Sequence, residues 1–433
     1  MQKIANIKDT GKKRVVVAGG GFAGLELAKR LLKKGFQVVV IDKNNYHQFQ
    51  PLFYQVATAG LEPSSISFPL RKVFHRKRAD VHFRMARLQK VHPDKQFIET
   101  DIGMLSYYYL VIATGVSTNY FGIENIKEHA VPMKSVSEAI YLRNNILQSY
   151  EQALNHEDEN KTEALMNVVV VGGGPTGVEL AGALAEMKKY ILPKDYPELD
   201  FSKMTIRLVE AGDRLLAGFS EKSGEKAHRY LEKLGVEVAL RTMVQDYDGV
   251  HIDTNKGQYI AETMIWAAGV AGKRINGLPE EVWTQNNRIL TDEFNQVKGL
   301  KNIYAVGDIA LTKTSAYPEG HPQVAQVAIQ QAAHLSKNLM KKENGMQLTP
   351  FEYRYKGSLA TIGRKLAVAD LPGVHLGGFV AWILWLLVHL MAIVGVRNRV
   401  FIFLNWMWNY ITYDQSLRLL IRPKIFRYHN MTE

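Results

Sequence analysis

The sequence predicts an α/β protein made of two similar strand–turn–helix units, followed by an apolar C-terminal segment. Two glycine-rich motifs, at residues 15–24 and 168–177, each follow a run of β-branched residues and open a helical stretch. The third observation is residues 376–396, which carry no charge apart from a possible one on His389. Because 433 residues exceed the size of one ordinary hydrophobic core, we expect two or three domains.

Both motifs have the spacing G-x-G-x-x-G in the context that makes it specific, directly after a strand and before a helix. The three defining positions are Gly19, Gly21 and Gly24 in the first motif and Gly172, Gly174 and Gly177 in the second. The first glycine allows a tight turn, the second lets backbone approach a pyrophosphate, and the third permits close helix–strand packing. One such Rossmann-like unit is compatible with a dehydrogenase. Two predict that a flavin and a nicotinamide dinucleotide are brought together.

The bulk composition narrows the class of protein. Hydrophobic residues make up 46% of the chain, which excludes a wholly membrane-embedded protein. Lys and Arg outnumber Asp and Glu by 54 to 42, and this basic balance suits nucleic acid, anionic membranes or anionic cofactors. Since no nucleic-acid-binding module is visible, we expect no nucleic-acid partner and favour an anionic membrane surface.

The chain contains no cysteine, which excludes several kinds of chemistry. Disulfides, thiolate–metal sites and flavoenzyme mechanisms based on a dithiol or persulfide all require cysteine. We predict no metal site. The first nine residues lack the apolar core of a signal peptide, so the catalytic part is expected in the cytoplasm.

The first half of the chain reads as a nucleotide-binding unit. A helix is expected over residues 25–34 and a strand over 36–41, which ends at Asp42. A carboxylate at that point can accept hydrogen bonds from ribose hydroxyls, the alternative being a solvated loop Asp. Residues 46–61 are too apolar for a surface loop and should line something. A strand over 108–113 then runs into Thr114 and Gly115, a sharp turn suited to backbone near a cofactor.

The second half repeats the arrangement. Ser135 and Glu138 form a capping-box pattern that opens a helix through about residue 154. The helix after the second motif continues through Glu179, and a strand over 205–209 ends at Glu210, which we assign to a ribose rather than to the surface. Gly269 follows another strand exit. A short strand then delivers Gly307 and Asp308, suited to a cofactor's ribityl or phosphate region and to a return to the first unit.

These elements give predicted domain limits. Residues 1–118 and 291–345 are predicted to form one discontinuous dinucleotide-binding domain, residues 119–290 a second one, and residues 346–433 a membrane-association region. The family resemblance set out below implies that the first is the FAD-binding domain and the second the NADH-binding domain.

The C-terminal region has two apolar parts. Residues 376–396, with Trp382 and Trp385, are long enough for a transmembrane helix. Residues 400–413 form an amphipathic helix. Its apolar face carries Phe401, Leu404, Trp408 and Ile411; its polar face carries Asn405, Asn409, Thr412 and Ser416; a basic tail follows with Arg418, Arg422, Lys424 and Arg427. We expect the segment to lie in one leaflet, because a single span would put the basic tail on the far side. The alternative is a buried helical hairpin of a soluble dimer.

Together these residues resemble the type II NADH dehydrogenases, single-chain NADH:quinone oxidoreductases that bind two dinucleotides. The resemblance covers nearly the whole chain. Its most specific element is residues 325–330, Ala-Gln-Val-Ala-Ile-Gln, in which Gln326 and Gln330 share a helix face. Without the resemblance these two would be ordinary helix polars. The resemblance implies FAD and NADH as cofactors and a membrane quinone as substrate. It also implies a peripheral position on the cytoplasmic face of the inner membrane and a possible homodimer.

The resemblance also implies roles for individual residues. FAD would be held by Gly19, Gly21, Gly24, Asp42, Thr114, Gly115 and Asp308. NADH would be held by Gly172, Gly174, Gly177 and Glu210. Further cofactor contacts are expected at Phe22, Ala23, Lys43, Ala325, Gln326, Pro175, Thr176, Glu179 and Gly269.

The catalytic residues implied by the resemblance are Glu179, Gln326, Gln330 and Lys365. Glu179 would lie near nicotinamide and flavin, where a carboxyl in an apolar cleft has a raised pKa and can handle protons. The alternatives are a cap or a salt bridge for Glu179 and a surface charge for Lys365.

The expected reaction passes hydride from NADH to FAD and then two electrons, with protons, to a quinone. No transmembrane proton relay is visible, so no ion pumping is expected. Glu210 favours NADH over NADPH, while Arg207 and Arg214 leave some NADPH use open. Sulfide:quinone oxidoreductases and disulfide reductases need cysteines for their chemistry. Because this chain has none, both classes are excluded. A reductase or oxidase with a soluble acceptor, and a redox sensor that binds NADH, remain as alternatives.

Overall fold

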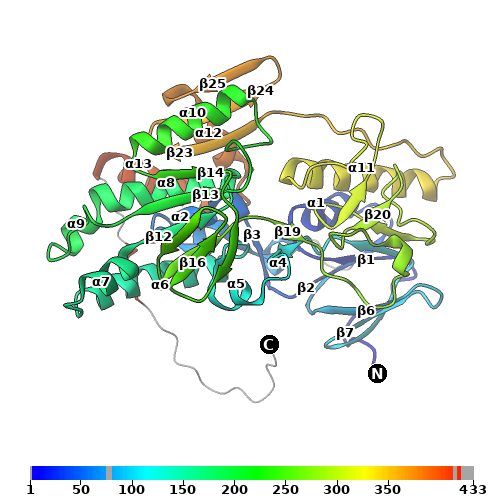
Figure 1. Ribbon diagram of the computed structural model, residues 1–433. Helices are drawn as coiled ribbons and strands as arrows, with labels where there is room; N and C mark the ends of the chain where they lie inside the picture. Colours follow the sequence, from blue (N-terminus) through cyan, green and yellow to red (C-terminus); the bar gives the residue numbers. More distant parts are fainter. Residues whose placement is uncertain (1, 75–79, 413–416, 421–433) are drawn as a thin grey trace.

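The computed structural model describes residues 2–74, 80–412 and 417–420. Two five-stranded parallel sheets form the framework, in two lobes that lie side by side (Figure 1). The first sheet has the order β21 (Ile303–Ala305), β9 (Tyr109–Ile112), β1 (Arg14–Ala18), β2 (Gln37–Asp42), β5 (Val81–Met85). The second has the order β11 (Val131–Pro132), β18 (Thr263–Trp266), β12 (Val168–Val171), β13 (Ile206–Glu210), β14 (Glu237–Leu240).

The first sheet is covered on both faces, which explains why its central strand is a continuous run of valines. Helices α1 (Phe22–Leu31) and α11 (Ala325–Glu343) pack with one face. The antiparallel strands β6 (Leu88–His92), β7 (Phe97–Thr100) and β8 (Gly103–Ser106) lie over the other. Helix α1 begins three residues earlier than predicted, because the last residues of the glycine motif already form its first turn.

The second sheet carries α8 (Pro175–Tyr190) directly after its glycine motif and α10 (Glu221–Lys233) after β13. The predicted helix start is present at α6 (Val136–Ala153), where Ser135 is the N-cap and its Oγ accepts from the backbone N–H of Glu138 at 3.2 Å. The reciprocal bond of a capping box is not formed. The Glu138 carboxylate accepts from Lys134 N, one residue before the cap, rather than from the cap residue itself. Strands β15 (Val244–Tyr247), β16 (His251–Thr254) and β17 (Gly257–Ile260) form a small sheet beside it.

The remaining elements are short. They are β3 (Tyr46–Gln48), η1 (Gln50–Leu52), α2 (Phe53–Ala57), α3 (Pro63–Ile66), β4 (Ser67–Pro69), α4 (Leu70–Phe74), β10 (Ser117–Thr118), α5 (Glu124–His129), α7 (Glu159–Met166), α9 (Leu192–Asp195), β19 (Val270–Ala271), η2 (Glu280–Val282), β20 (Ile289–Thr291) and β22 (Ala310–Thr312). We keep the domain limits predicted from the sequence as a proposal.

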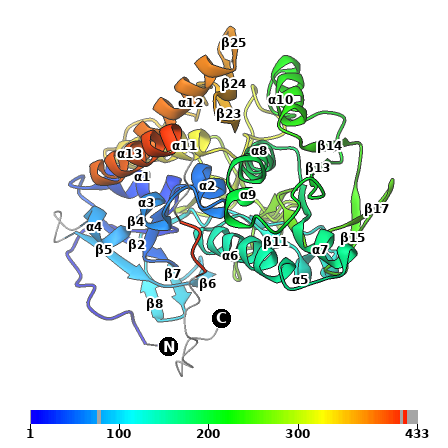
Figure 2. The ribbon, with the colours of Figure 1, turned by 90° about the vertical axis from the view of Figure 1, so that its left-hand side faces the viewer.

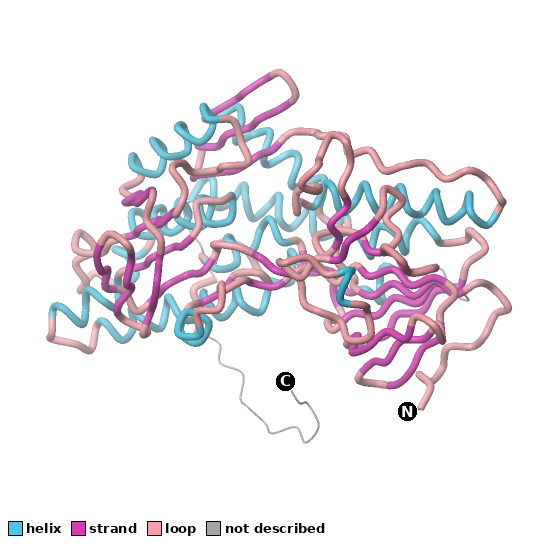
Figure 3. Tube along the Cα trace, turned by 45° about the vertical axis from the view of Figure 1, so that its right-hand side comes forward, coloured by secondary structure: helices cyan, strands magenta, loops and turns pink. Residues whose placement is uncertain are grey.

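The C-terminal region returns to the second lobe. After α11 the chain runs as a long loop over residues 344–357 to a three-stranded antiparallel sheet (Figure 3). Its strands are β23 (Ser358–Gly363), β24 (Leu366–Leu371) and β25 (Val374–Gly377). Strand β23 packs against α8 so closely that a Cβ on Gly182 would lie 1.6 Å from the carbonyl oxygen of Ile362. Only glycine fits at that position of α8.

Two helices follow, α12 (Phe379–Ala392) and α13 (Val396–Thr412), which are neighbours on one edge of the molecule, with α13 close to α3 (Figure 2). The 21-residue apolar stretch is therefore not one helix. Its first residues belong to β25, and Gly378 and Gly395, both with positive φ, bound the helix between them. Among residues 2–74, 80–412 and 417–420, no helix has the length and apolarity needed to cross a membrane.

The amphipathic helix begins at Val396, four residues before the predicted start. Its apolar face points outward, with Phe401, Leu404, Trp408 and Ile411 between 51% and 73% exposed. Its asparagines face the protein, since Asn409 Nδ2 donates to the carbonyl of Gly60 at 3.2 Å. Ser416 and the basic residues Arg422, Lys424 and Arg427 lie outside the described residues.

Candidate active site

The first glycine motif forms an open cradle at the end of β1. Gly19 has φ +113°, and a Cβ there would lie 2.2 Å from the carbonyl oxygen of Ala113 on the neighbouring strand exit. A Cβ on Gly24 would lie 1.8 Å from the carbonyl oxygen of Gly19. At Gly21 a Cβ would meet no described atom within 4 Å. The outer two glycines are thus required by packing, while the middle position faces open space.

The second motif repeats this geometry. Gly172 has φ +112°, and its Cβ would lie 2.6 Å from the carbonyl oxygen of Ala267. A Cβ on Gly177 would lie 1.9 Å from the carbonyl oxygen of Gly172, and one on Gly174 would meet no described atom within 4 Å. Pro175 takes the first position of α8, where its missing N–H costs nothing. Two equivalent sites for a pyrophosphate follow from this repetition.

The two strand-end acids are held in the same way. Asp42 Oδ2 accepts from Gly20 N at 2.6 Å, and Glu210 Oε2 accepts from Gly173 N at 2.5 Å. The other oxygen of each carboxylate accepts from a backbone N–H two residues further on, Asn44 for Asp42 and Gly212 for Glu210. Burial raises the pKa of Asp42, and its two backbone donors oppose that rise. Each acid is therefore fixed against its own glycine motif, where a ribose adjoins a pyrophosphate.

The sequence analysis gave no role to Gly20 and Gly173, the middle residues of the three consecutive glycines in each motif. A Cβ on Gly20 would lie 2.7 Å from Leu70 Cδ1, and one on Gly173 would lie 2.9 Å from Glu210 Oε2. The extra glycine leaves room for the acid to reach the motif backbone.

The remaining predicted FAD residues gather at the same edge of the first sheet. Thr114 and Gly115 follow β9, and Gly307 and Asp308 follow the adjacent β21. A Cβ on Gly307 would lie 3.3 Å from that of Ala23. The N–H of Gly307 donates to the buried side chain of Gln331 at 2.8 Å. Gln331 therefore positions this turn, and the sequence did not reveal it.

Two residues predicted to contact FAD, Lys43 and Phe22, have other surroundings than the glycines and acids of the cradle. Lys43 is exposed, and the Phe22 ring packs edge-on against His47 and Phe49, at centroid distances of 5.2 and 5.8 Å. In the second unit, a Cβ on Gly269 would meet the exposed ring of Phe121 at 3.0 Å.

These observations test whether the first cradle fits FAD. The open middle glycine, the fixed carboxylate of Asp42 and the Gly307–Asp308 turn converge on one sheet edge, as a dinucleotide-binding Rossmann unit requires. The residues present fit the cofactor.

The two glutamines of α11 face the loop that leads to the C-terminal region. Gln326 Nε2 donates to the carbonyl of Gly357 at 2.9 Å, and Gln330 exchanges two hydrogen bonds with the backbone of Arg354. Ala325 is the first residue of this helix. In the described structure both glutamines therefore tie α11 to residues 354–357.

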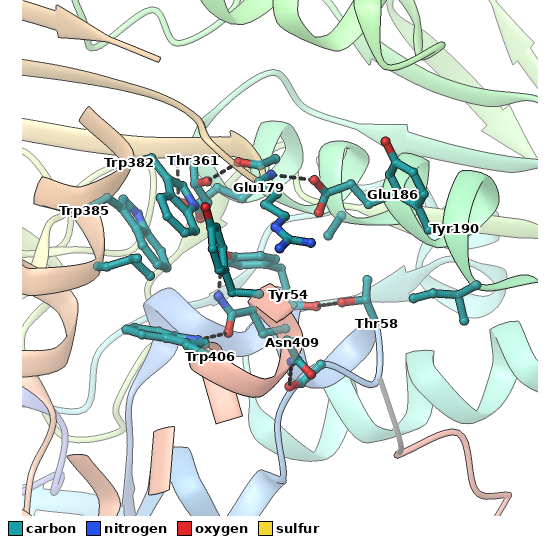
Figure 4. Close-up of a pocket in the computed structure, with 18 residues that line it drawn as sticks. Tyr54, Thr58, Glu179, Glu186, Tyr190, Thr361, Trp382, Trp385, Trp406 and Asn409 are labelled. Carbon is teal, nitrogen blue, oxygen red and sulfur yellow. Dashed lines mark hydrogen bonds between the residues drawn. The ribbon is translucent and has the colours of Figure 1, made fainter. Parts of the chain in front are cut away.

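A pocket of about 880 Å³, its open mouth included, lies between α8, α2 and the C-terminal helices (Figure 4). The α8 wall presents residues at positions i, i+4, i+7 and i+11. The lining residues are Glu179, Ala183, Glu186 and Tyr190 from α8; Ile191; Tyr54, Gln55, Thr58 and Gly60 from α2 and the turn after it; Thr361, Gly363 and Arg364 from β23 and its turn; and Trp382, Trp385, Leu386, Trp406, Asn409 and Tyr410 from α12 and α13. The apolar stretch 46–61 thus does line a cavity.

Glu179 is the most enclosed acid of this pocket, with 7% of its surface exposed. Burial raises its pKa to about 8, although the backbone N–H of Thr361 and the indole of Trp385 act in the opposite direction. A carboxyl with this pKa exists in both protonation states near neutral pH and can give and take a proton.

Side chains around Glu179 join α2 to the C-terminal helices. Trp406 Nε1 donates to Gln55 Oε1 at 2.8 Å, and Gln55 Nε2 donates to Tyr54 Oη at 2.7 Å. The Tyr54 ring meets that of Trp385 edge-on at 6.4 Å. Sequence reasoning found the segment but not these residues, because aromatic pocket walls read as hydrophobic core.

Lys365 lies at the rim rather than in the wall. It takes a positive φ at the turn after β23, is exposed, and has its ammonium 5.4 Å from the centroid of the Tyr410 ring. The neighbouring Arg364 lines the pocket, with its guanidinium 4.3 Å from the same centroid. A quinone-side role for Lys365 stays a prediction.

Two family models match this chain and define its class of enzyme. The family model described as pyridine nucleotide-disulphide oxidoreductase matches residues 13–332, and a model described as the NDH2 C-terminal domain matches residues 355–412. The chain is therefore an oxidoreductase of the two-dinucleotide fold that the two cradles define. Since it has no cysteine, the disulphide chemistry in the first description is not its own.

The relatives narrow the class. A type II NADH:quinone oxidoreductase of Mycobacterium tuberculosis is 34% identical over 91% of this chain and 87% of its own length. The type II NADH:quinone oxidoreductase of Staphylococcus aureus is 30% identical over 85% of this chain and 92% of its own. The chain belongs to the type II NADH:quinone oxidoreductase family, which confirms the resemblance seen in the sequence.

Solved structures share the fold. NDH2 from Plasmodium falciparum in complex with NADH matches with a TM-score of 0.86 and 22% identity, over 95% of this chain and 100% of that one. The sulfide:quinone oxidoreductase of Aquifex aeolicus matches with a TM-score of 0.70 and 18% identity, over 92% and 91%.

Proposed function

We propose that this protein is a peripheral NADH:quinone oxidoreductase that oxidises NADH, reduces a membrane quinone and pumps no protons. The observation that carries the assignment is the pocket in which Glu179, on the helix that opens the second dinucleotide cradle, meets the aromatic side chains of α12 and α13. The walls of that pocket come from α8 and from the C-terminal helices, whose other side chains form the outward apolar surface.

The residues of the two cradles bind and orient the dinucleotides. Gly19, Gly21, Gly24, Asp42 and Asp308 would hold FAD, which when bound supplies the group that accepts hydride from NADH and passes two electrons to the quinone. Gly172, Gly174 and Gly177 would face the NADH pyrophosphate, and Glu210 its adenosine ribose. A carboxylate at this position repels a 2′-phosphate, and therefore favours NADH.

The two arginines near Glu210 support the preference for NADH. Arg214 donates to the backbone carbonyls of Ala217 and Phe219, and Arg207 pairs with Glu237 and lies over the Tyr259 ring. Both guanidinium groups are thus committed to protein partners.

Glu179 would give a proton to the quinone. Its pKa of about 8 leaves it largely protonated at neutral pH, and the aromatic side chains of α12 and α13 line the pocket beside it.

The outward face of α12 and α13 supports attachment to the cytoplasmic face of the cell membrane. The exposed apolar side chains include Phe379, Val380, Ile383, Leu387, Val388, Met391, Phe401, Leu404, Trp408 and Ile411. Exposed Lys72 and Arg397 stand near the start of α13, where Phe68 contacts Gly395. Apolar side chains flanked by cations suit an anionic lipid surface.

A homodimer is a further proposal from the family resemblance, tested by light scattering of the detergent-solubilised protein.

Steady-state oxidation of NADH tests the function. A short-chain quinone should support rapid turnover, whereas oxygen or a soluble one-electron acceptor should support much less. An oxidase or soluble-acceptor reductase would show the opposite order, and a sensor would stop after one reduction. In proteoliposomes NADH oxidation should build no proton gradient; a gradient would contradict the absence of pumping.

A further inference from the structure

The proposed reaction requires one proton from solvent in every turnover. NADH gives up a hydride, which is two electrons and one proton, whereas a quinone takes up two electrons and two protons to become a quinol. The second proton must reach the quinone through the protein. This inference rests on the proposed function.

The enclosed Glu179 needs a partner to be reprotonated. Its carboxylate is buried among α2, β23 and α12, away from bulk solvent. Tyr54 is a poor proton carrier, since burial and the nearby Glu179 and Glu186 raise the pKa of its phenol well above 10. A second carboxyl in the pocket with better access to solvent would give that proton a shorter path.

Glu186 has the necessary position. It lies seven residues after Glu179 on the same face of α8, about 10 Å along the helix axis, and both carboxylates line the pocket (Figure 4). The residue between them on that face is Ala183, which leaves the pocket open to water along the α8 wall. Glu186 is only partly buried, so the two acids form an inner and an outer position.

The β23 turn fixes the outer carboxylate. Glu186 Oε1 accepts from the backbone N–H of Arg364 at 2.5 Å. The charged and titratable groups around it are Arg364 and Lys365 from this turn, Tyr54 from α2, Tyr190 from α8 and Tyr410 from α13. Burial raises the pKa of Glu186 while the Arg364 N–H and guanidinium oppose the rise, so Glu186 holds a proton more readily than an exposed glutamate does.

We propose that Glu186 is the outer carboxyl of a two-carboxyl proton path, which carries solvent protons to Glu179 during quinone reduction. After Glu179 has given its proton to a quinone oxygen, Glu186 gives its own proton through pocket water to the Glu179 carboxylate. Glu186 then takes a proton from solvent. Only O–H bonds break and form, and no electrons move along this path.

The test is Glu186→Gln, which keeps an oxygen for the Arg364 N–H but cannot carry a proton. The enzyme is reduced with NADH and mixed with a short-chain quinone, while flavin absorbance and a pH-indicator dye are followed together. We expect unchanged reduction by NADH, about tenfold slower reoxidation and proton uptake, and a larger solvent isotope effect. Small weak acids such as formate should restore the rate, as should Glu186→Asp.

Two further variants make the result decisive. Glu225→Gln changes an exposed acid of α10 and should leave all rates unchanged. Ala183→Leu narrows the space between the carboxylates and should slow reoxidation even if Glu186→Gln does not fold. Normal rates in Glu186→Gln would overturn the proposal. So would a slowing that small acids do not relieve, because that indicates misplacement of the β23 turn. If quinone fails to reoxidise even the unmodified enzyme, the proposed function itself is wrong.

Discussion

The backbone N–H of Thr361 on β23 donates to Glu179 Oε1 on α8, with an N–O distance of 3.4 Å. This contact joins the C-terminal sheet to the helix that begins at the second glycine motif. The proton-carrying group proposed for quinone reduction is therefore positioned by both the nucleotide-binding framework and the region that carries the apolar helices.

Quinone reduction should depend on the protonation of Glu179. With a pKa of about 8, the group is protonated below pH 8, so the reoxidation rate of the reduced enzyme should fall as the pH rises through 8. Glu179→Gln should lower that rate by about 10²-fold and remove this pH dependence. Stopped-flow reoxidation between pH 6 and 9.5 checks both effects, and an unchanged profile in the variant would contradict the role.

The same carboxyl should cost stability at alkaline pH. Its folded pKa lies above the ordinary value of 4.5, so the folded state binds more protons and stability should fall as the pH rises from about 4.5 to 8. Glu179→Gln should be more stable than the unmodified protein at pH 8 by up to a few kcal/mol, and show little difference at pH 5. Thermal unfolding at the two pH values measures this, and an equal difference at both would count against it.

Glu210 should set the choice of nicotinamide cofactor. Glu210→Gln removes the charge that repels a 2′-phosphate and weakens the hold on Gly173 N, so the NADH/NADPH ratio of kcat/KM should narrow about tenfold. The exposed-acid variant Glu225→Gln is the matched control. If the NADH/NADPH ratio of kcat/KM is unchanged in Glu210→Gln, Glu210 does not bind the ribose.

The contact between α8 and β23 should be intolerant of a methyl group. Gly182→Ala places a Cβ 1.6 Å from the Ile362 carbonyl oxygen and should destabilise the protein by about 1–3 kcal/mol. Because the clash separates the C-terminal sheet from α8, quinone reduction should suffer more than reduction by NADH. Gly218→Ala, where a Cβ meets no described atom within 4 Å, should be neutral in denaturant unfolding. Equal behaviour of the two variants would refute this packing argument.

The apolar face of α13 should govern membrane binding rather than chemistry. Ile411→Glu and Trp408→Ser change exposed side chains, and should release the protein from anionic vesicles in a flotation assay. Turnover with a short-chain quinone should be retained. Binding that survives both changes would place the membrane contact elsewhere.

The framework could be predicted from the sequence because each signal is local. The two glycine motifs, the β-branched strands and the acids Asp42 and Glu210 follow one another at short spacing. The structure forms the strands in this order and bonds both acids to the backbone of their motifs, while their cofactor roles stay predictions. The helix N-cap at Ser135 was visible for the same reason, although Glu138 does not complete a capping box.

The pocket that we propose for quinone reduction could not be predicted in this way. Its walls come from five separate parts of the chain, and residues such as Tyr54, Trp385 and Trp406 are indistinguishable from core in the sequence. Glu186 gave no signal because a second acid two turns along a helix usually marks a solvated face. The apolar stretch was read as one long helix because composition does not show where Gly378 ends a strand.

Anaerobic double-mixing stopped flow tests the central claim most directly. The purified protein is mixed first with one equivalent of NADH and then with a short-chain quinone, while the flavin absorbance is recorded. We expect rapid bleaching of the flavin absorbance by NADH and its rapid, complete return on addition of quinone. Bleaching that quinone fails to reverse, while a soluble acceptor does reverse it, would contradict the assignment.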